Sequence, residues 1–105
     1  MIRAVFTVEN SIVTGVTVSG HSDYSEQGSD VVCAAVSSAV YMTANTITDV
    51  QQLDCSVAVD DGFLQIKLSP NEAKQAQVIL NGLLLHLDAL SKEYAEYIDL
   101  KLSEV

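Results

Sequence analysis

The stretch 2–19 reads IRAVFTVENSIVTGVTVS and divides into two alternating segments around Asn10 and Ser11. In residues 2–9 every second side chain is apolar, and residues 12–19 are rich in the β-branched residues Val and Thr. Such alternation is typical of strands with one buried face, and Asn-Ser between two of them indicates a tight turn. We therefore predict an antiparallel hairpin at residues 2–19, from which the rest of the fold can be worked out.

Two helices follow from the spacing of apolar residues and from capping signals. Residues 30–50 contain neither Gly nor Pro and predict a largely buried helix, with Ser29 or Asp30 as its N-cap. Ser69 and Pro70 predict the start of a second helix, because Ser caps helices and Pro favours their first position. The predicted elements are, in chain order, strands at 2–9 and 12–19, a helix at 30–50, strands at 54–60 and 63–69, a helix running from Pro70 to Tyr94, and a strand at 97–103.

This ββαββαβ order predicts an α+β fold in two layers, with two helices packed on one face of a small mixed or antiparallel sheet. The chain has 105 residues, which predicts a single domain spanning 1–105 with one modest core. The first helix is rich in β-branched residues, which are weak helix formers, so packing against the sheet must stabilise it.

The composition is acidic, because fourteen Asp and Glu against five Lys and Arg give a formal net charge of −9. Such a surface repels phosphate backbones, so we predict no direct nucleic-acid partner, and it attracts basic protein segments. The two Cys are too few for a disulfide framework, and no Cys/His cluster indicates a metal site. The most apolar stretch, Val78 to Leu90, is too short to span a bilayer, so we predict a soluble cytoplasmic protein without a membrane partner.

The stretch 20–38, GHSDYSEQGSDVVCAAVSS, carries the groups from which a catalytic site can be built. It places His21 at the end of a predicted strand and Cys33 in the first turn of a predicted helix, with a polar loop between them. A helix N-terminus and a protonated His both lower the pKa of a thiol, and the thiolate is a strong nucleophile. His can then act as general base and acid, while free N–H groups of the first turn can stabilise an oxyanion.

From these residues alone, a structural interpretation stays open beside the catalytic one. Cys33 also fits a small core residue in a Val- and Ala-rich helix, and His21 fits a loop residue bonded to backbone. We interpret Cys55, on a predicted strand, as a core or half-buried residue. His86 lies at the margin of the second helix's apolar stripe, where a packing or interface role fits.

The loop between His21 and the helix offers candidates for binding a substrate. Asp23 and Glu26 fit either solvated charges or groups that attract a basic substrate segment. Tyr24 fits either an aromatic wall for the substrate or an anchor for the loop. We take these three residues as the candidate substrate-binding set.

The same stretch resembles the signature of the ribosomal-processing cysteine protease family, Prp. The family pattern is Gly-His near the end of the second strand, then Gly-x-Asp-Ile/Val-Val-Cys-Ala at the start of the first helix. The matching residues here are Gly20-His21 and the stretch 28–34, GSDVVCA. Chain length, element order and an acidic C-terminal region are also similar, so the resemblance covers essentially the whole chain.

The resemblance implies a cysteine endopeptidase in which Cys33 is the nucleophile and His21 its base, with no metal or cofactor. Asp30 matches the aspartate of the family motif, and its role is to cap the helix, to orient His21, or both. The implied substrate is large-subunit ribosomal protein 27, whose short N-terminal extension is removed before the ribosome is mature. The resemblance also implies a homodimer.

Other functions remain open from the residues themselves. A non-catalytic acidic module would hold a basic ribosomal protein and keep Cys33 in its core, whereas an accessible thiol favours the enzyme. A redox sensor would use the same thiol but lacks an evident resolving Cys. On the second helix, Val78, Leu85 and Ala89 lie opposite the core stripe, and we predict that this apolar back face meets a partner.

Overall fold

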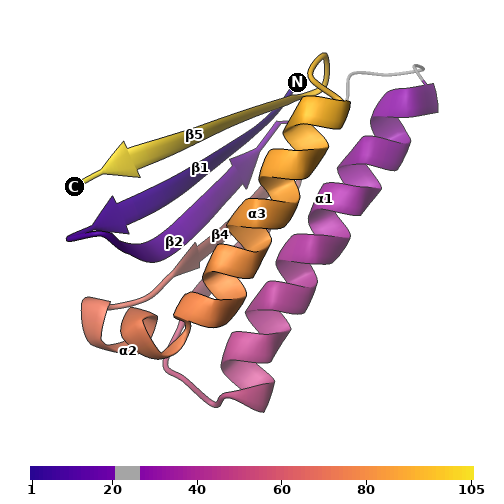
Figure 1. Cartoon of the computed structure of the whole chain (residues 1–105). Helices are drawn as coiled ribbons and strands as arrows, with labels where there is room; N and C mark the ends of the chain where they lie inside the picture. The colour runs from indigo at the N-terminus through magenta and orange to yellow at the C-terminus, as the bar shows by residue number, and fades with distance from the viewer. Residues whose placement is uncertain (21–26) are drawn as a thin grey trace.

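The computed structural model describes residues 1–20 and 27–105, and for residues 27–30 it describes the backbone alone. In this part of the chain one five-stranded sheet is covered on one face by helices, as Figure 1 shows. The elements, in chain order, are β1 (Ile2–Glu9), β2 (Ile12–Ser19), α1 (Gln27–Asn45), η1 (Thr46–Val50), β3 (Ser56–Asp60), β4 (Phe63–Lys67), α2 (Pro70–Gln75), α3 (Gln77–Glu93) and β5 (Ile98–Glu104). The predicted two-layer α+β fold is confirmed.

The strands lie in the order β3-β4-β2-β1-β5, so the two hairpins are neighbours and the last strand joins at the far edge. Neighbouring strands are antiparallel except β1 and β5, which run parallel with Ile2 opposite Ile98. The sheet is therefore mixed. Figure 1 shows how α3 leads the chain back along the sheet, which lets β5 enter in the same direction as β1.

The first hairpin forms as its sequence predicts. Asn10 and Ser11 both have positive φ, 51° and 65°, which is the backbone of the two-residue turn that matches strand twist. The turn leaves Glu9 opposite Ile12, and the register shifts between Thr7 and Val8. A shift of this kind marks a bulge, which bends the strand and changes which side chains face the core.

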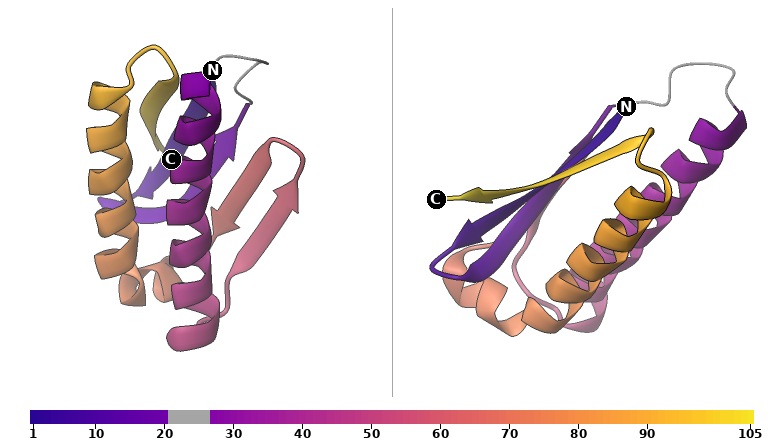
Figure 2. Two further views of the ribbon diagram at one scale, coloured as in Figure 1. Left: turned by 90° about the vertical axis from the view of Figure 1, so that its right-hand side faces the viewer. Right: turned by 45° about the horizontal axis from the view of Figure 1, so that its top comes forward.

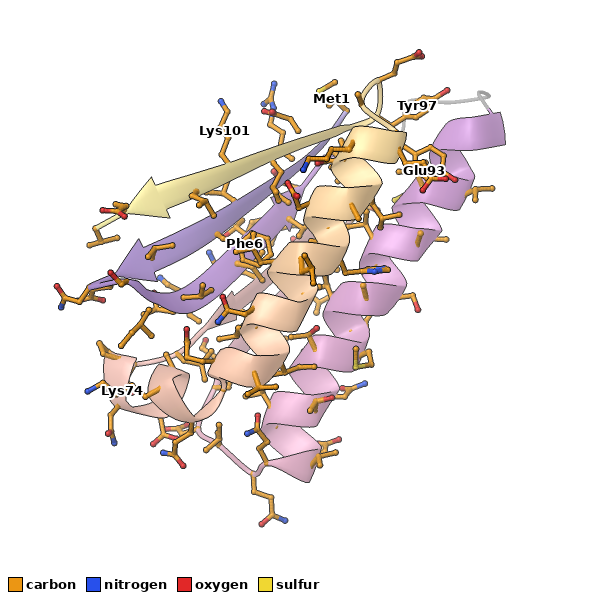
Figure 3. All side chains as sticks on the ribbon, viewed as in Figure 1. Met1, Phe6, Lys74, Glu93, Tyr97 and Lys101 are labelled. Atoms are coloured by element: carbon orange, nitrogen blue, oxygen red, sulfur yellow. The ribbon has the colours of Figure 1, made fainter. Side chains whose placement is uncertain are left out.

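The core lies between the sheet and the helices. Figure 3 places Phe6 there, between β1 and α3, and Phe6 is fully buried. By length and composition alone, residues Val31–Val50 could also cross a membrane. However, this segment's buried stripe, Val32, Val36, Val40 and Ile47, belongs to the same core, which accounts for its apolar composition.

The first helix begins earlier than its sequence predicts. It starts at Gln27, so Ser29 and Asp30 lie inside the first turn and the prediction that one of them is the N-cap is wrong. The physical reason is that Gly28 is no barrier, since a Gly inside a helix costs only about 1 kcal/mol relative to Ala.

At its other end α1 continues without a break into the π-helical turn η1, where the Gln51 N–H donates to the Thr46 carbonyl at 2.8 Å. Thr43, Thr46 and Thr48 each donate a side-chain hydroxyl to the carbonyl four residues earlier, at 2.7 to 3.0 Å. These hydroxyls compete with backbone N–H groups for the same carbonyls, which loosens the last turns of the helix.

The second predicted helix is in fact two. Ser69 caps it as expected, because its hydroxyl accepts from the Glu72 N–H at 3.4 Å, but the helix breaks at Ala76. The break lets Gln77 turn its amide onto the backbone of Val13, donating to the carbonyl at 2.7 Å and accepting from the N–H at 3.1 Å. This pairing fixes the start of α3 against β2. The prediction of one unbroken helix is therefore wrong.

Candidate active site

A cleft of about 250 Å³ opens between α1, the end of β2 and the turn that joins β3 to β4. The side of α1 provides one wall and the β3–β4 turn provides the opposite wall. The residues that line the cleft are Ile2, Val18, Gly20, Cys33, Val36, Ser37, Tyr41, Asp60, Asp61, Gly62, Phe63 and Leu64. The cleft thus combines a thiol, two carboxylates and two aromatic rings over an apolar floor.

Cys33 lies in the α1 wall of this cleft. Its side chain is half-buried and packs against the edge of the core, and its thiol forms no disulfide. Ser37 and Tyr41 follow at four-residue steps, so one face of the helix presents all three side chains to the cleft. A half-buried thiol in a cleft is accessible to a ligand, which favours the enzyme over the interpretation of Cys33 as a core residue.

Cys33 lies in the second turn of α1, not in the first turn as its sequence predicts, because the helix begins at Gln27. At about 1.5 Å of rise per residue, the first-turn residues 27–30 precede Cys33 along the helix axis by roughly 4.5 to 9 Å. The prediction that Cys33 lies in the first turn of the helix is therefore wrong, and an oxyanion site made of first-turn N–H groups stays a prediction.

Gly20 brings the end of β2 into the cleft. Its φ is +99°, and a Cβ atom there would collide with the backbone carbonyl oxygen of Met1. Its N–H donates to the Gly62 carbonyl at 3.0 Å, which ties β2 to the β3–β4 turn. Only glycine accepts both the backbone conformation and the close approach. The residue that follows Gly20 in the chain is His21.

Replacing Gly20 with Ala therefore combines backbone strain with a steric collision, and we expect a loss of roughly 2–4 kcal/mol in the free energy of unfolding. The matched control is Gly82→Ala in the middle of α3, where an added Cβ has nothing within 4 Å. We expect the Gly82→Ala change to raise the free energy of unfolding by about 0.5–1 kcal/mol. Urea denaturation of both variants measures the difference, and a Gly20 variant as stable as the wild type would contradict this account.

The turn between β3 and β4 forms the acidic side of the cleft. Asp60 accepts from the Asp61 N–H at 2.8 Å, and Gly62 completes the turn with a φ of 66°. Phe63 follows as a half-buried aromatic residue that also lines the cleft. The turn thus places negative charge and an aromatic ring on the same side of the cleft.

Four of the residues that the sequence singles out, His21, Asp23, Tyr24 and Glu26, lie outside the described residues. The backbone of Asp30 belongs to α1, about one turn before Cys33, and its side chain is outside the description. The roles predicted for the His21 and loop side chains, and for Asp30 in catalysis, therefore stay predictions.

Cys55 and His86 stand apart from this cleft. Cys55 precedes β3, is half-buried, and donates weakly to the Ser56 carbonyl at 3.8 Å. Burial raises the pKa of the Cys55 thiol, which makes it a poorer nucleophile near neutral pH. His86 is exposed on α3 and lines a separate groove between α1 and α3. In the described part of the chain, no group of three or more His, Cys, Asp or Glu residues is placed to hold a metal ion.

Several lining residues were not anticipated from sequence. Ser37 and Tyr41 could have been found from the sequence, because residues four and eight positions after Cys33 on a helix lie on the same face as Cys33. Asp60, Asp61 and Phe63 could not have been found in this way, because the turn between β3 and β4 comes beside α1 only through the pairing of β4 with β2. Long-range strand order is not contained in the local pattern of a hairpin.

The matched family is described as Cysteine protease Prp, and it covers residues 1–99. The ribosomal processing cysteine protease Prp of Staphylococcus aureus is 33% identical over 103 residues, which span 95% of this chain and 97% of that protein. The protein of the same name in Bacillus subtilis is 24% identical over 85 residues, 75% of this chain and 76% of that protein.

Solved structures show the same likeness. A Streptococcus mutans protein has a TM-score of 0.90 at 29% identity, covering 100% of this chain and 96% of that one. An essential ribosomal processing protease Prp from S. aureus, in complex with a substrate peptide, has a TM-score of 0.87 at 31% identity. The match covers 98% of this chain and 100% of that one. The S. aureus protease with a covalently linked product peptide has a TM-score of 0.85 at 32% identity. With sequence and fold in agreement over nearly its full length, the chain belongs to the Prp family of cysteine proteases and is itself a cysteine protease.

Proposed function

We propose that this protease removes the N-terminal extension of large-subunit ribosomal protein 27 during ribosome maturation, with Cys33 as nucleophile and His21 as base. The observation that carries the proposal is the half-buried Cys33 thiol in a cleft of about 250 Å³. The S. aureus relative with a covalently linked product peptide supports covalent chemistry with peptides on this fold. The relatives' role in ribosomal processing supports a ribosomal protein as substrate.

The mechanism proceeds in two halves. His21 takes the proton from the Cys33 thiol, and the thiolate attacks the carbonyl carbon of the scissile peptide bond. The C–N bond breaks as His21 returns the proton to the leaving amine, which leaves a thioester on Cys33. Water, deprotonated by His21, then attacks the thioester, and the acid product leaves as the thiol is restored. Every step uses groups of the protein, the peptide and water.

Asp30 supports this chemistry from the same helix. It precedes Cys33 by three residues, which places both on neighbouring positions of one helical face. In the proposal its carboxylate orients His21 or holds the segment that carries His21. A carboxylate beside a thiol by itself disfavours the thiolate, so pairing of Asp30 with His21 is the arrangement that helps catalysis.

The charge of the cleft fits a basic substrate. Asp60 and Asp61 line it, and in the proposal Asp23 and Glu26 add to the same field, with Tyr24 as a further wall. The whole chain carries a formal −9. A ribosomal protein segment that faces RNA is basic, so the signs are complementary. Salt screens the attraction between exposed charges, with a screening length of about 8 Å at physiological ionic strength.

Incubation with the extended ribosomal protein, followed by mass analysis, tests the proposal. We expect one new species that lacks the N-terminal extension and a matching short peptide. The control substrate is the same protein without its extension, which should keep its mass. An unchanged mass for the extended protein, or cutting at many positions in both substrates, would show that this is not the substrate.

The proposal places the protein in the cytoplasm as a homodimer. Neither Cys33 nor Cys55 forms a disulfide, which suits a reducing compartment in which a catalytic thiol survives. The dimer surface we propose is the back face of α3, where Val78 is 91% exposed and Leu85 is 73% exposed. Beside Leu85 a groove of about 490 Å³ lies between α3 and β5.

Changing Leu85 to Lys tests this dimer surface. Because a charged side chain would have to be desolvated at the interface, we expect the dimer to dissociate at least about tenfold more readily. Met42→Lys is the matched control, since Met42 is also an exposed apolar residue but lies on α1. Light scattering over a concentration series gives the mass of both variants. If Leu85→Lys stays as dimeric as the control, the interface lies elsewhere.

A further inference from the structure

The Ser37 hydroxyl is an unused hydrogen-bond donor beside the nucleophile. Ser37 follows Cys33 by about one turn of α1, and both side chains line the cleft. Further along the same helical segment, Thr43, Thr46 and Thr48 each donate a hydroxyl to the carbonyl four residues earlier. The Ser37 hydroxyl makes no such bond, nor any other hydrogen bond within the described part of the chain. It is therefore available to a ligand.

This hydroxyl is open to the cleft. Among the described residues, no buried side-chain oxygen or nitrogen lacks a hydrogen-bond partner, so the unpaired Ser37 oxygen is not a buried atom. The residue as a whole is half-buried. Figure 2 (left) shows the β3–β4 hairpin beside α1, and the cleft lies between α1 and the turn of that hairpin. A peptide bound in the cleft can thus contact the Ser37 hydroxyl.

Helix geometry brings the Ser37 side chain close to the reacting thiol. Side chains four residues apart on a helix have Cβ atoms about 5–6 Å apart. Every Cα–Cβ bond tilts toward the helix N-terminus, so the Ser37 side chain leans toward the turn that contains Cys33. When the Cys33 sulfur bonds to a carbonyl carbon, the carbonyl oxygen extends one bond beyond that carbon. This oxygen can lie between the two side chains, at the roughly 2.7–3.1 Å from a donor that stabilises an oxyanion.

The other polar side chains that the structure places around the cleft are less suited to this role. Asp60 and Asp61, when ionised, only accept hydrogen bonds, and they repel a negatively charged oxygen. Tyr41 carries a hydroxyl but follows Cys33 by eight residues, a rise of about 12 Å along the helix axis. Of the described side chains that line the cleft, Ser37 is therefore the donor nearest to the thiol along the helix.

We propose that Ser37 is a catalytic residue whose hydroxyl donates a hydrogen bond to the oxyanion of the tetrahedral intermediates formed on Cys33. This role rests on the proposed function only in placing the nucleophile at Cys33. As the S–C bond forms, the C=O bond of the substrate becomes a C–O⁻ single bond, and Ser37 stabilises the negative oxygen without giving up its proton. In the first half of the reaction the C=O bond re-forms as the C–N bond breaks.

In the second half, water adds to the thioester and produces a second oxyanion, which collapses as the C–S bond breaks. The Ser37 hydroxyl holds the oxygen in both intermediates. Because this hydrogen bond strengthens as negative charge develops, it lowers the barrier of the chemical step more than it tightens substrate binding. The effect of removing it should therefore fall on kcat.

Ser37→Ala tests this role, and because Ala favours helices the variant keeps its fold. We expect kcat for cleavage of the extended ribosomal protein to fall roughly 10²-fold, with a much smaller change in KM. Ser37→Thr retains a hydroxyl and should recover most of the loss. The matched control is Ser38→Ala, because Ser38 is exposed on the same helix and lines the separate groove between α1 and α3. A wild-type kcat in Ser37→Ala, or an equal loss in Ser38→Ala, would overturn the proposal.

Iodoacetamide distinguishes this role from activation of the thiol. The thiolate displaces iodide from a saturated carbon in this reaction, so no oxyanion forms. The measurement uses the Cys55→Ala background, so that Cys33 is the one thiol that reacts. The alkylation rate should be the same with and without Ser37→Ala. An alkylation rate that falls as much as kcat would overturn the proposal, because Ser37 would then act on the thiol.

A peptide aldehyde tests the same site without the ribosomal protein. N-acetyl-trileucine aldehyde adds the Cys33 sulfur to its carbonyl carbon, and its oxygen receives the thiol proton, whereas the corresponding alcohol forms no bond. Calorimetric titration should show that the wild type binds the aldehyde more tightly than the alcohol, and that Ser37→Ala lowers this preference roughly tenfold. A wild type without this preference would overturn the oxyanion site.

The two assays distinguish failure of the proposed substrate from failure of the Ser37 role. A wild type that leaves the extended protein uncut, yet prefers the aldehyde in a way that depends on Ser37, would refute the proposed substrate and keep the role of Ser37. A Ser37→Ala variant that cuts the protein and binds the aldehyde as the wild type does would refute the role of Ser37 and keep the substrate.

Discussion

We expect the Cys33→Ala variant to cut the proposed substrate, the extended ribosomal protein, at least about 10³-fold more slowly than the wild type. The change removes the nucleophile, so no thioester can form and only the unassisted attack of water remains. Its thermal midpoint should fall by only a few degrees, because losing the sulfur of a half-buried side chain lowers the free energy of unfolding by about 1 kcal/mol or less. Mass analysis and a thermal melt measure both effects.

Cys55→Ala is the matched control for this experiment. It removes the other half-buried thiol, which lies outside the cleft. This variant should cleave at the wild-type rate. Cys33→Ser should remain nearly inactive, since a hydroxyl is far harder to deprotonate than a thiol. Turnover by Cys33→Ala comparable to that of the wild type would end the assignment of Cys33 as nucleophile.

Replacing His21 with Ala should lower cleavage by roughly 10²- to 10⁴-fold, the usual contribution of general acid–base catalysis. The variant loses the base that takes the thiol proton and the acid that protonates the leaving amine. Alkylation of Cys33 by iodoacetamide should also slow near neutral pH, because less thiolate is present. The alkylation rate reports on the thiol alone and needs no substrate.

His86→Ala is the matched control for the base, because His86 is exposed in a separate groove. It should leave both the cleavage and the alkylation rates unchanged. Equal alkylation of Cys33 in the wild type and in His21→Ala would mean that His21 does not activate the thiol, whatever its effect on cleavage.

Most of the fold could be predicted from local patterns. The alternation in residues 2–9, the turn at Asn10 and Ser11, and the cap at Ser69 are each determined by neighbours in sequence, and all three are confirmed. Two predictions about the helices were wrong: where α1 begins, and that the second helix is unbroken. The break at Ala76 accompanies hydrogen bonds between the Gln77 amide and Val13 of β2, which a local pattern does not show. The early start of α1 includes Gly28, whose place in a helix costs only about 1 kcal/mol of helix stability relative to Ala.

The site could be predicted less completely than the fold. Cys33 could be singled out from a motif, and the structure places its half-buried side chain in the wall of a cleft. The opposite wall could not be found, because Asp61 and Phe63 reach α1 only through the order of the strands. The exposure of β3 was hidden for a related reason. An alternating strand predicts that Val57 and Val59 share a face, but not that both remain exposed on it.

The parallel pairing of β5 with β1 connects the cleft to the C-terminal strand. Ile2 forms part of the cleft, and its described partners are on the C-terminal side of the chain: its N–H donates to the Tyr97 carbonyl at 2.8 Å, and it pairs with Ile98. Residues 18–64 supply the other lining side chains, so the pairing with β5 is the most distant contact in sequence that holds a cleft residue, and such contacts form late in folding. We therefore expect the complete cleft, and with it full activity, only after β5 has been synthesised and has joined the sheet.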